Sequence, residues 1–291
     1  MIENAQKGMK KEVFKMSMIR LMSHNQWACN KNMPAWEEQG LDCSAEVREK
    51  GFARVFGEIL PDIIGLQEMT DVMTDYMIRY SMDVGLHYAL LWGNYTPIAY
   101  RPDKLDLVDT AFRVYPEEIP GYEGSFNNSR SKSYSIGVFR IKENGNFLIF
   151  ATTHLWYMDE PDLAGSDQAR AYQIGMLIDH IDVLQKKYDC PAIIVGDFNA
   201  DYHSLALQKA FSCGFLHTHD IAVEYKDETN GYHGCGVSGY DPYVPAPFEC
   251  GIDHILVRNA PVGAIRRFDR YYPEYYMPLS DHFPVFVDIE L

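Results

Sequence analysis

Polar side chains of the types that bind metals and phosphates follow several of the apolar segments in this chain. They are Asn25, Glu68, His154, Asp197, Asn199, Asp253, Asp281 and His282. The clearest example is the apolar run 191–196, which leads directly into Asp197-Phe198-Asn199. Side chains alternate along a strand, so Asp197 and Asn199 should face one side and Phe198 the other. The whole set suggests metal-assisted hydrolysis of a phosphoester.

Some of these groups offer the oxygen atoms that a hard cation requires. The carboxylates of Glu68 and Asp281, together with Asn25 or Asp197, suit Mg²⁺, or alternatively Mn²⁺, better than zinc. A cation bound there would offset the negative charge of phosphate oxygens. The sequence therefore predicts a site for a hard divalent cation.

A second pair of groups predicts acid–base chemistry. Asp253 enters an apolar strand, where an unpaired carboxylate is costly, so it requires a partner. His282 directly follows the carboxylate Asp281, and a histidine beside a buried carboxylate is a suitable general base. We therefore expect Asp253 to pair with His282. His254 should face the opposite side of the strand from Asp253 and be structural.

Each of these residues, taken alone, also has a structural explanation. Asn25 suits a turn, and Glu68 suits the start of a helix, where the helix dipole favours an acid. His154 alone could be a hydrogen-bonded histidine of the core. Asp197 and Asn199 could simply form a loop. The set is more specific than its members, because so many polar groups at strand ends would otherwise be unexplained.

The elements expected to position these groups are strands and helices in mixed order. Strands are expected near 13–22, 63–66, 87–92, 97–100, 134–141, 147–153, 191–196, 252–257, 263–268 and up to 289, and helices near 44–60, 71–83, 167–187 and 203–212. Several strand pairs are joined by hairpins, and no Gly-x-Gly-x-x-Gly or Walker sequence follows the early strands. The pattern predicts a polar lead-in over 1–12 and one α/β domain over 13–291 with largely antiparallel sheets.

The bulk composition limits the class of partner. The chain has 291 residues, and its 41 acidic and 26 basic side chains give a net charge of -15. Such a chain repels polyanions, which disfavours non-specific binding to duplex DNA. The six cysteines lack Cys-x-x-Cys spacing, so we expect reduced thiols, with disulfides or a zinc site as alternatives. No segment predicts a signal peptide or a membrane span, so we expect a cytoplasmic monomer without membrane contact.

Taken in order, these motifs resemble the endonuclease/exonuclease/phosphatase superfamily, whose fold is that of deoxyribonuclease. The matching segments are Asn25, Gln67-Glu68, Thr153-His154-Leu155, Gly196-Asp197-Phe198-Asn199, Ile252-Asp253-His254 and Ser280-Asp281-His282-Phe283-Pro284. They extend over about residues 17–291. The resemblance implies a four-layer α/β/β/α sandwich with two largely antiparallel sheets and a site at one end. It also implies a metal-dependent phosphoric ester hydrolase.

The resemblance further implies roles for the metal and base residues. Glu68 would ligate the Mg²⁺, with Asn25 and Asp281 nearby. His282, held by Asp253, would act as the base toward the attacking water or would hydrogen-bond the phosphate.

The remaining site residues receive roles from the same resemblance. Asp197 and Asn199 would orient the nucleophile and a phosphate oxygen, and His154 would stabilise the developing charge. Local motifs resemble the deadenylase/nocturnin-like and bacterial branch, among them the pattern His-Leu…Arg-x-x-Gln that starts at His154. In that branch the substrate contacts would fall at Arg130, Tyr232 and His233.

Several classes of phosphorylated substrate fit this sequence. The loop over 217–250 is rich in aromatic residues that could stack a base, although the rings could equally pack the loop onto the domain. We expect a nucleotide or a small phosphorylated metabolite, with single-stranded nucleic acid as the alternative and a phospholipid headgroup third. The alternative to an enzyme is a catalytically inactive binding module of the same fold. Tight metal-independent ligand binding without turnover would favour that alternative.

Overall fold

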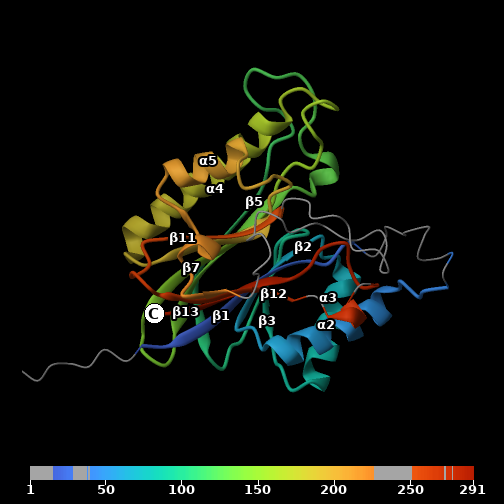
Figure 1. Ribbon diagram of the computed structural model, residues 1–291, viewed down its shortest axis with the longest axis vertical. Coiled ribbons are helices and arrows are strands. Elements are labelled where there is room, and N and C mark those ends of the chain that lie inside the picture. The colour runs from blue at the N-terminus through green and yellow to red at the C-terminus, as the bar shows by residue number, and fades with distance from the viewer. Residues whose placement is uncertain (1–15, 29–37, 39, 226–250, 272, 277) are drawn as a thin grey trace, which may run out of the picture.

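The computed structural model describes residues 16–28, 38, 40–225, 251–271, 273–276 and 278–291. Two mixed β-sheets pack face to face, with helices on their outer sides (Figure 1). The predicted four-layer sandwich is confirmed. The predicted lead-in over 1–12 lies outside the described residues, and the boundaries of the single domain stay a prediction. Among the described helices, none is both long and apolar enough to cross a membrane.

The first sheet has seven strands in the order β10 (Glu224–Tyr225), β12 (Ile265–Arg270), β13 (Val285–Glu290), β1 (Met18–Asn25), β2 (Ile63–Gln67), β4 (Ile98–Tyr100) and β3 (Ala89–Leu91). The second has six in the order β5 (Leu105–Val114), β6 (Ser133–Ile141), β7 (Phe147–His154), β8 (Ala192–Asp197), β11 (Asp253–Arg258) and β9 (Leu216–His217). Among the described strands, the pairs β1–β2, β7–β8 and β10–β12 run parallel and the others antiparallel.

The helices form the outer layers. They are α2 (Ala45–Ile59) and α3 (Asp71–Asp83) on the first sheet, and α4 (Ser166–Tyr188) and α5 (Leu205–Ser212) on the second, with the short α6 (Thr218–Ile221), η1 (Asn128–Arg130) and η3 (Glu274–Tyr276) in connections. Ser44 and Thr70 cap α2 and α3, since each hydroxyl accepts a bond from a backbone N–H of the first turn. The helix ranges therefore follow the predicted ones closely.

Apolar side chains fill the space between the sheets and the space under each helical layer. Leu21 and Ile63 of the first sheet meet Phe150 and Val195 of the second, and all four are fully buried. Strands buried on both faces read as apolar runs, which is why β2 and β8 could be predicted. Burial of this apolar surface is the main term that stabilises the sandwich.

Gly65 of β2 allows the two sheets to approach closely below the site. A Cβ atom at this position would lie 2.3 Å from Cγ2 of Val195 and 2.8 Å from Cβ of Thr152, both in the other sheet. Nearby, Nε2 of Gln67 donates to Oγ1 of Thr152 at 2.8 Å. Glycine therefore fits here because of a close approach between β2 and its neighbours, not because of a turn.

Two parts of the chain differ from the predicted elements. Strand β5 was not predicted, because it forms the edge of its sheet and most of its residues are only half-buried, so it has no continuous apolar run. The segment 217–250 was predicted to be an irregular loop, but its described part, up to residue 225, contains the end of β9, α6 and β10. These elements have only two to four residues each, too few to give a periodic signal.

Candidate active site

The register of the strands brings the predicted residues to one end of the sandwich. Asn25 at the end of β1 pairs with Gln67 at the end of β2. His154 at the end of β7 pairs with Asp197 at the end of β8. Asp253, the first residue of β11, lies opposite Asp197 in the antiparallel ladder. The polar residues at these strand ends therefore lie at the same end of the sandwich.

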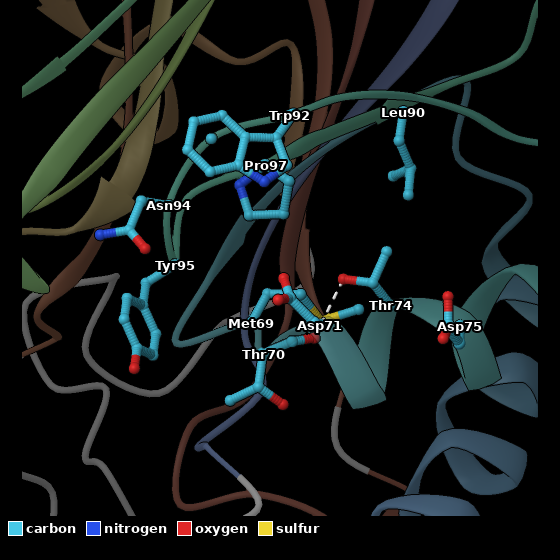
Figure 2. A pocket seen from close by; sticks show the side chains of 11 residues that line it. Met69, Thr70, Asp71, Thr74, Asp75, Leu90, Trp92, Asn94, Tyr95 and Pro97 are labelled. Atoms are coloured by element: carbon cyan, nitrogen blue, oxygen red, sulfur yellow. Dashed lines mark hydrogen bonds between the residues drawn. The ribbon is translucent and has the colours of Figure 1, made fainter.

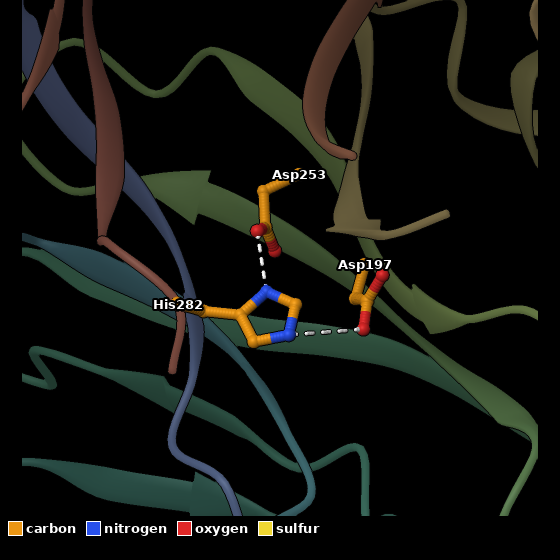
Figure 3. A group of neighbouring side chains, drawn as sticks. All are labelled: Asp197, Asp253 and His282. Carbon is orange, nitrogen blue, oxygen red and sulfur yellow. Dashed lines mark hydrogen bonds and ion pairs between the residues drawn. The ribbon is translucent and has the colours of Figure 1, made fainter. Parts of the chain in front are cut away.

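His282 and Asp253 form a buried pair (Figure 3). Nδ1 of His282 donates to Oδ2 of Asp253 at 2.7 Å, and Nε2 of the same ring lies 3.8 Å from Oδ2 of Asp197. Burial raises the pKa of the Asp253 carboxyl above its usual range, against the attraction of His282. Burial lowers the pKa of His282, but the carboxylates of Asp253, Asp197 and Asp281 outweigh it and raise that pKa well above the usual value. The carboxylate thus fixes the ring orientation and favours the imidazolium.

Asp197 lies at the centre of this cluster and is almost completely buried. Its Oδ2 accepts from Nδ2 of Asn25 at 2.9 Å and lies 3.3 Å from Nε2 of His154. Its Oδ1 accepts from the backbone N–H of Asn199 at 2.9 Å. Burial opposes ionisation, but the positive charges of His282, His154 and Lys132 outweigh it and lower the pKa of Asp197. Asp197 is therefore an anion at neutral pH.

Lys132 is a residue of this cluster that the sequence analysis missed. It precedes β6, is 4% exposed, and its Nζ contacts Nε2 of His154. Lys132 thus adds a positive charge next to Asp197 and His154. Its signal in the sequence was weak but present, since Lys132 borders an apolar strand just as the other site residues do.

The three predicted substrate contacts are not among the described residues of this cluster. Arg130 is exposed and does not line the cavity into which the cluster opens. Its backbone carbonyl accepts from Nδ2 of Asn94 at 2.9 Å. Lys132, two positions later, lies in the site instead. Tyr232 and His233 fall outside the described residues.

The cluster opens into a cavity of about 570 Å³. Its walls comprise Ala28, Glu68, Tyr95, Asn128, Ser129, Ser131, Lys132, His154, Tyr157, Asp197, Asn199, Asp281 and His282. Oε2 of Glu68 accepts from the backbone N–H of Ala28 at 3.2 Å. The backbones of Glu68 and Tyr95 are left-handed, with φ of 57° and 58°. Met69, the residue after Glu68, forms an isolated β-bridge with Tyr95. Non-glycine residues held in this region are strained, and such strain is common at functional sites.

The donors present fit a hard divalent cation. Glu68 and Asp281 supply carboxylate oxygens to one cavity, as Mg²⁺ prefers. A different group, Asp197, Asp253 and His282, has potential ligand atoms within 4.8 Å of one another. In the second group Nδ1 of His282 donates to Asp253 and has no lone pair left for a cation, so Glu68 and Asp281 fit the cation better.

Asn25, predicted as a further metal ligand, binds protein groups in the structure. Its Nδ2 donates to Asp197, and its Oδ1 accepts from the backbone N–H of Trp27 at 2.9 Å. Asn25 is fully buried and is not part of the cavity wall. In this arrangement the amide orients Asp197.

Two residues of α4 hold the segment that follows His154. The guanidinium of Arg170 donates to the carbonyls of Trp156 and Met158, and Oε1 of Gln173 accepts from the backbone N–H of Trp156. Both α4 side chains are buried. The predicted His-Leu…Arg-x-x-Gln pattern thus describes a support for the site.

Phe198 and His254 lie on the side of their strands away from the site. Their rings pack edge to face with centroids 5.2 Å apart. Nδ1 of His254 lies 3.1 Å from Nε2 of His217, and its Nε2 lies 2.8 Å from the carbonyl oxygen of Ala200. The predicted structural role of His254 agrees with these contacts.

Solved structures share this fold over nearly the whole chain. An endonuclease/exonuclease/phosphatase family protein from Bacteroides thetaiotaomicron is 19% identical, with a TM-score of 0.72 over 95% of this chain and 96% of that one. A mannosyl-6-phosphatase from the same organism is 21% identical, with a TM-score of 0.67 over 92% and 98%. The human nocturnin catalytic domain with bound sulfate is 16% identical, with a TM-score of 0.60 over 94% and 96%. These likenesses establish the fold.

A family profile connects the sequence itself to this fold. No curated protein sequence matches the chain significantly. The profile described as "Endonuclease/Exonuclease/phosphatase family" matches residues 22–282, a range that contains every described residue of the cluster. This chain therefore belongs to the endonuclease/exonuclease/phosphatase family.

Proposed function

We propose that this chain is a phosphoric ester hydrolase that depends on Mg²⁺, or alternatively Mn²⁺, and acts on a small phosphorylated molecule. The observation that carries the proposal is the buried Asp253–His282 pair, which faces Asp197 across 3.8 Å. The same cavity contains the carboxylates of Glu68 and Asp281. Family membership supports a phosphoester as substrate, and one protein of the same fold is named a mannosyl-6-phosphatase.

The nucleophile in this proposal is a water molecule between Asp197 and His282. A water can hydrogen-bond to both Oδ2 of Asp197 and Nε2 of His282, because these atoms are 3.8 Å apart. Asp253 holds the imidazole in place, so the direction of attack is set before substrate binds. Asp197, the anion of the two, takes the proton of the water as the oxygen attacks phosphorus and the bond from phosphorus to the leaving oxygen breaks on the opposite side. The imidazolium of His282 holds the attacking oxygen through its Nε2–H.

Other groups of the cavity wall would bind the phosphate oxygens. Lys132 contributes an ammonium, and His154 and Asn199 contribute an imidazole and an amide. Charge on these oxygens increases as the attacking water adds, so fixed donors lower the barrier. A divalent cation held by Glu68 and Asp281 would neutralise part of the same charge.

The size and charge of the site favour a small substrate. A cavity of about 570 Å³ is in the range of pockets for small molecules. The net charge of -15 disfavours extended contacts with a nucleic-acid backbone. Single-stranded nucleic acid is therefore the second candidate, after nucleotides and phosphorylated metabolites.

The test is a panel of phosphomonoesters and phosphodiesters, assayed with Mg²⁺, with Mn²⁺ and with EDTA. We expect hydrolysis of at least one member, loss of that activity in EDTA, and loss in Glu68→Gln. Glu118→Gln is the matched control, since Glu118 is exposed and outside the site. Hydrolysis that persists in EDTA and in Glu68→Gln would refute the proposed metal site, and a folded protein inactive on the whole panel would refute the proposed activity.

A further inference from the structure

A second cavity, which we call the outer pocket, adjoins the active-site cavity. It has a volume of about 400 Å³. Its walls comprise Met69, Thr70, Asp71, Thr74, Asp75, Leu90, Trp92, Gly93, Asn94, Tyr95 and Pro97 (Figure 2). Tyr95 lines both cavities, so the two cavities are neighbours.

Hydrogen bonds connect the wall of the outer pocket to the wall of the active site. Nδ2 of Asn94 donates to the carbonyl of Arg130 at 2.9 Å, and Oγ of Ser133 donates to the carbonyl of Asn94 at 2.7 Å. The segment between them, 131–132, lines the active-site cavity. The relative position of the two cavities is thus fixed by the loop over 92–97.

The outer pocket has an exposed aromatic surface. Trp92 is 64% exposed, although its ring contacts Phe112 edge to face at 5.1 Å between centroids. Leu90 and Pro97 add apolar surface to the same wall. An indole held on one side and open on the other offers a flat face to a ligand ring.

The charged groups of the outer pocket are two carboxylates, Asp71 and Asp75, which only accept hydrogen bonds. The carboxylates of Asp71 and Asp75 are exposed, and neither forms a hydrogen bond or ion pair with the residues that the structure describes. Asp71 lies in the first turn of α3, where the helix dipole explains an acid, but Asp75 lies one turn later, beyond that effect. Thr70 and Thr74 are already engaged, in the cap of α3 and in a bond to the carbonyl of Thr70.

These properties restrict the ligand. None of the described residues lining the outer pocket is basic, so a second phosphate or a polynucleotide backbone would be repelled. Carboxylates accept hydrogen bonds only, so they favour a ligand with several O–H donors. The apolar C–H face of a sugar ring fits the indole, and its hydroxyl groups fit Asp71 and Asp75.

We propose that the outer pocket binds the sugar ring of a sugar phosphate whose phosphate lies in the active-site cavity. The inference rests on the proposed function for the identity of the phosphate site. The binding of the ring itself does not require turnover, so the two claims can be tested separately.

The first experiment measures ring binding without phosphate. Methyl glycosides of glucose, mannose and galactose are tested by saturation-transfer NMR against the wild type, Trp92→Ala and Asp71→Asn/Asp75→Asn. We expect at least one glycoside to bind the wild type and to lose binding in both variants. Binding should persist in Tyr172→Ala, which removes an exposed ring on α4, and in Asp197→Asn, which disables the proposed chemistry.

The second experiment compares hydrolysis of the hexose 6-phosphates with hydrolysis of methyl phosphate. Trp92→Ala removes one ring contact, so it should lower kcat/KM for the preferred hexose phosphate about tenfold. The kcat/KM for methyl phosphate should stay unchanged. Equal effects on both substrates would overturn the inference. So would Trp92-dependent binding of adenosine or choline with no binding of any glycoside. Glycoside binding without hydrolysis of any phosphoester would instead refute the proposed function and leave the sugar site standing.

Discussion

Nδ1 of His282 lies 2.7 Å from Oδ2 of Asp253, and both side chains are buried. His282 lies just before β13 of the first sheet, and Asp253 begins β11 of the second, so the contact joins the two sheets. Asp197 ends its strand beside Asp253 at the same edge. A buried carboxylate that holds an imidazole gives the ring one orientation. Its other nitrogen then faces Asp197.

Replacement of Asp253 should therefore impair catalysis more than folding. Asp253→Asn retains an acceptor for Nδ1 of His282 but removes the charge that stabilises the imidazolium. We expect kcat for phosphoester hydrolysis to fall by about 10²–10⁴-fold, the usual contribution of acid–base catalysis. Asp83→Asn, at an exposed position of α3, is the control. A change in kcat of less than threefold in a folded Asp253→Asn protein would contradict this role.

Lys132, rather than Arg130, should bind the phosphate. Lys132→Met removes a buried ammonium next to Asp197, whereas Arg130→Met removes an exposed guanidinium outside the cavity. We expect kcat/KM to fall by about 10²-fold for Lys132→Met, which corresponds to one lost charge-assisted contact, and to stay within threefold for Arg130→Met. The reverse order of effects would show that the sequence-based prediction was right and the structural assignment wrong.

Gly65 and Gly175 should respond to alanine with opposite signs. A Cβ at Gly65 would lie 2.3 Å from Val195, so Gly65→Ala forces the sheets apart and should cost about 1–3 kcal/mol of the free energy of unfolding. Gly175 lies within α4, and the nearest atom to its Cβ would be Cε of Lys209 at 3.5 Å. Gly175→Ala should stabilise the protein by about 0.5–1 kcal/mol. Urea unfolding measures both, and destabilisation by both variants alike would count against the packing argument.

Glu49 should make the stability of the protein depend on pH. It is fully buried in α2, and its carboxylate oxygens accept no hydrogen bond from the described residues. Burial raises the pKa of Glu49 well above 4.5, against the attraction of Arg48. A raised carboxyl pKa means that the folded state holds a proton that the unfolded state releases. Its contribution to stability is therefore complete below pH 4.5 and declines as pH rises toward the folded pKa.

The comparison for Glu49 is Glu49→Gln, with the exposed Glu118→Gln as control. As pH rises from 5, the wild type should lose free energy of unfolding relative to Glu49→Gln until the folded pKa of Glu49 is reached. The Glu118→Gln curve should run parallel to that of the wild type. If the Glu49→Gln curve is also parallel to the wild type, the buried carboxyl does not titrate in this way.

Much of the site could be predicted because it follows from local rules. Asp253 required a partner because it enters a buried strand, and His282 is that partner. His154 and Asp197 meet because both end neighbouring strands. The opposite orientation of His254 followed from strand alternation.

Other features depend on tertiary structure that the sequence does not express locally. Lys132 borders an apolar strand, as many surface lysines do, and only the packing of β6 and β7 places it against His154. The outer pocket arises only where the loop over 92–97 meets the start of α3. The edge strand β5 lacks an apolar run, so its pattern resembled a loop. In each case burial is decided by distant segments rather than by neighbours in sequence.

The measurement that tests the central claim most directly is the rate of Mg²⁺-dependent phosphoester hydrolysis in Asp197→Asn. Asp197 contacts Asn25, His154 and the backbone of Asn199 and faces His282, so its charge is essential to the proposed attack. With the best substrate of the panel, we predict a rate at least about 10²-fold below that of the wild type and of the exposed control Asp162→Asn. A folded Asp197→Asn protein that retains the wild-type rate would contradict the account.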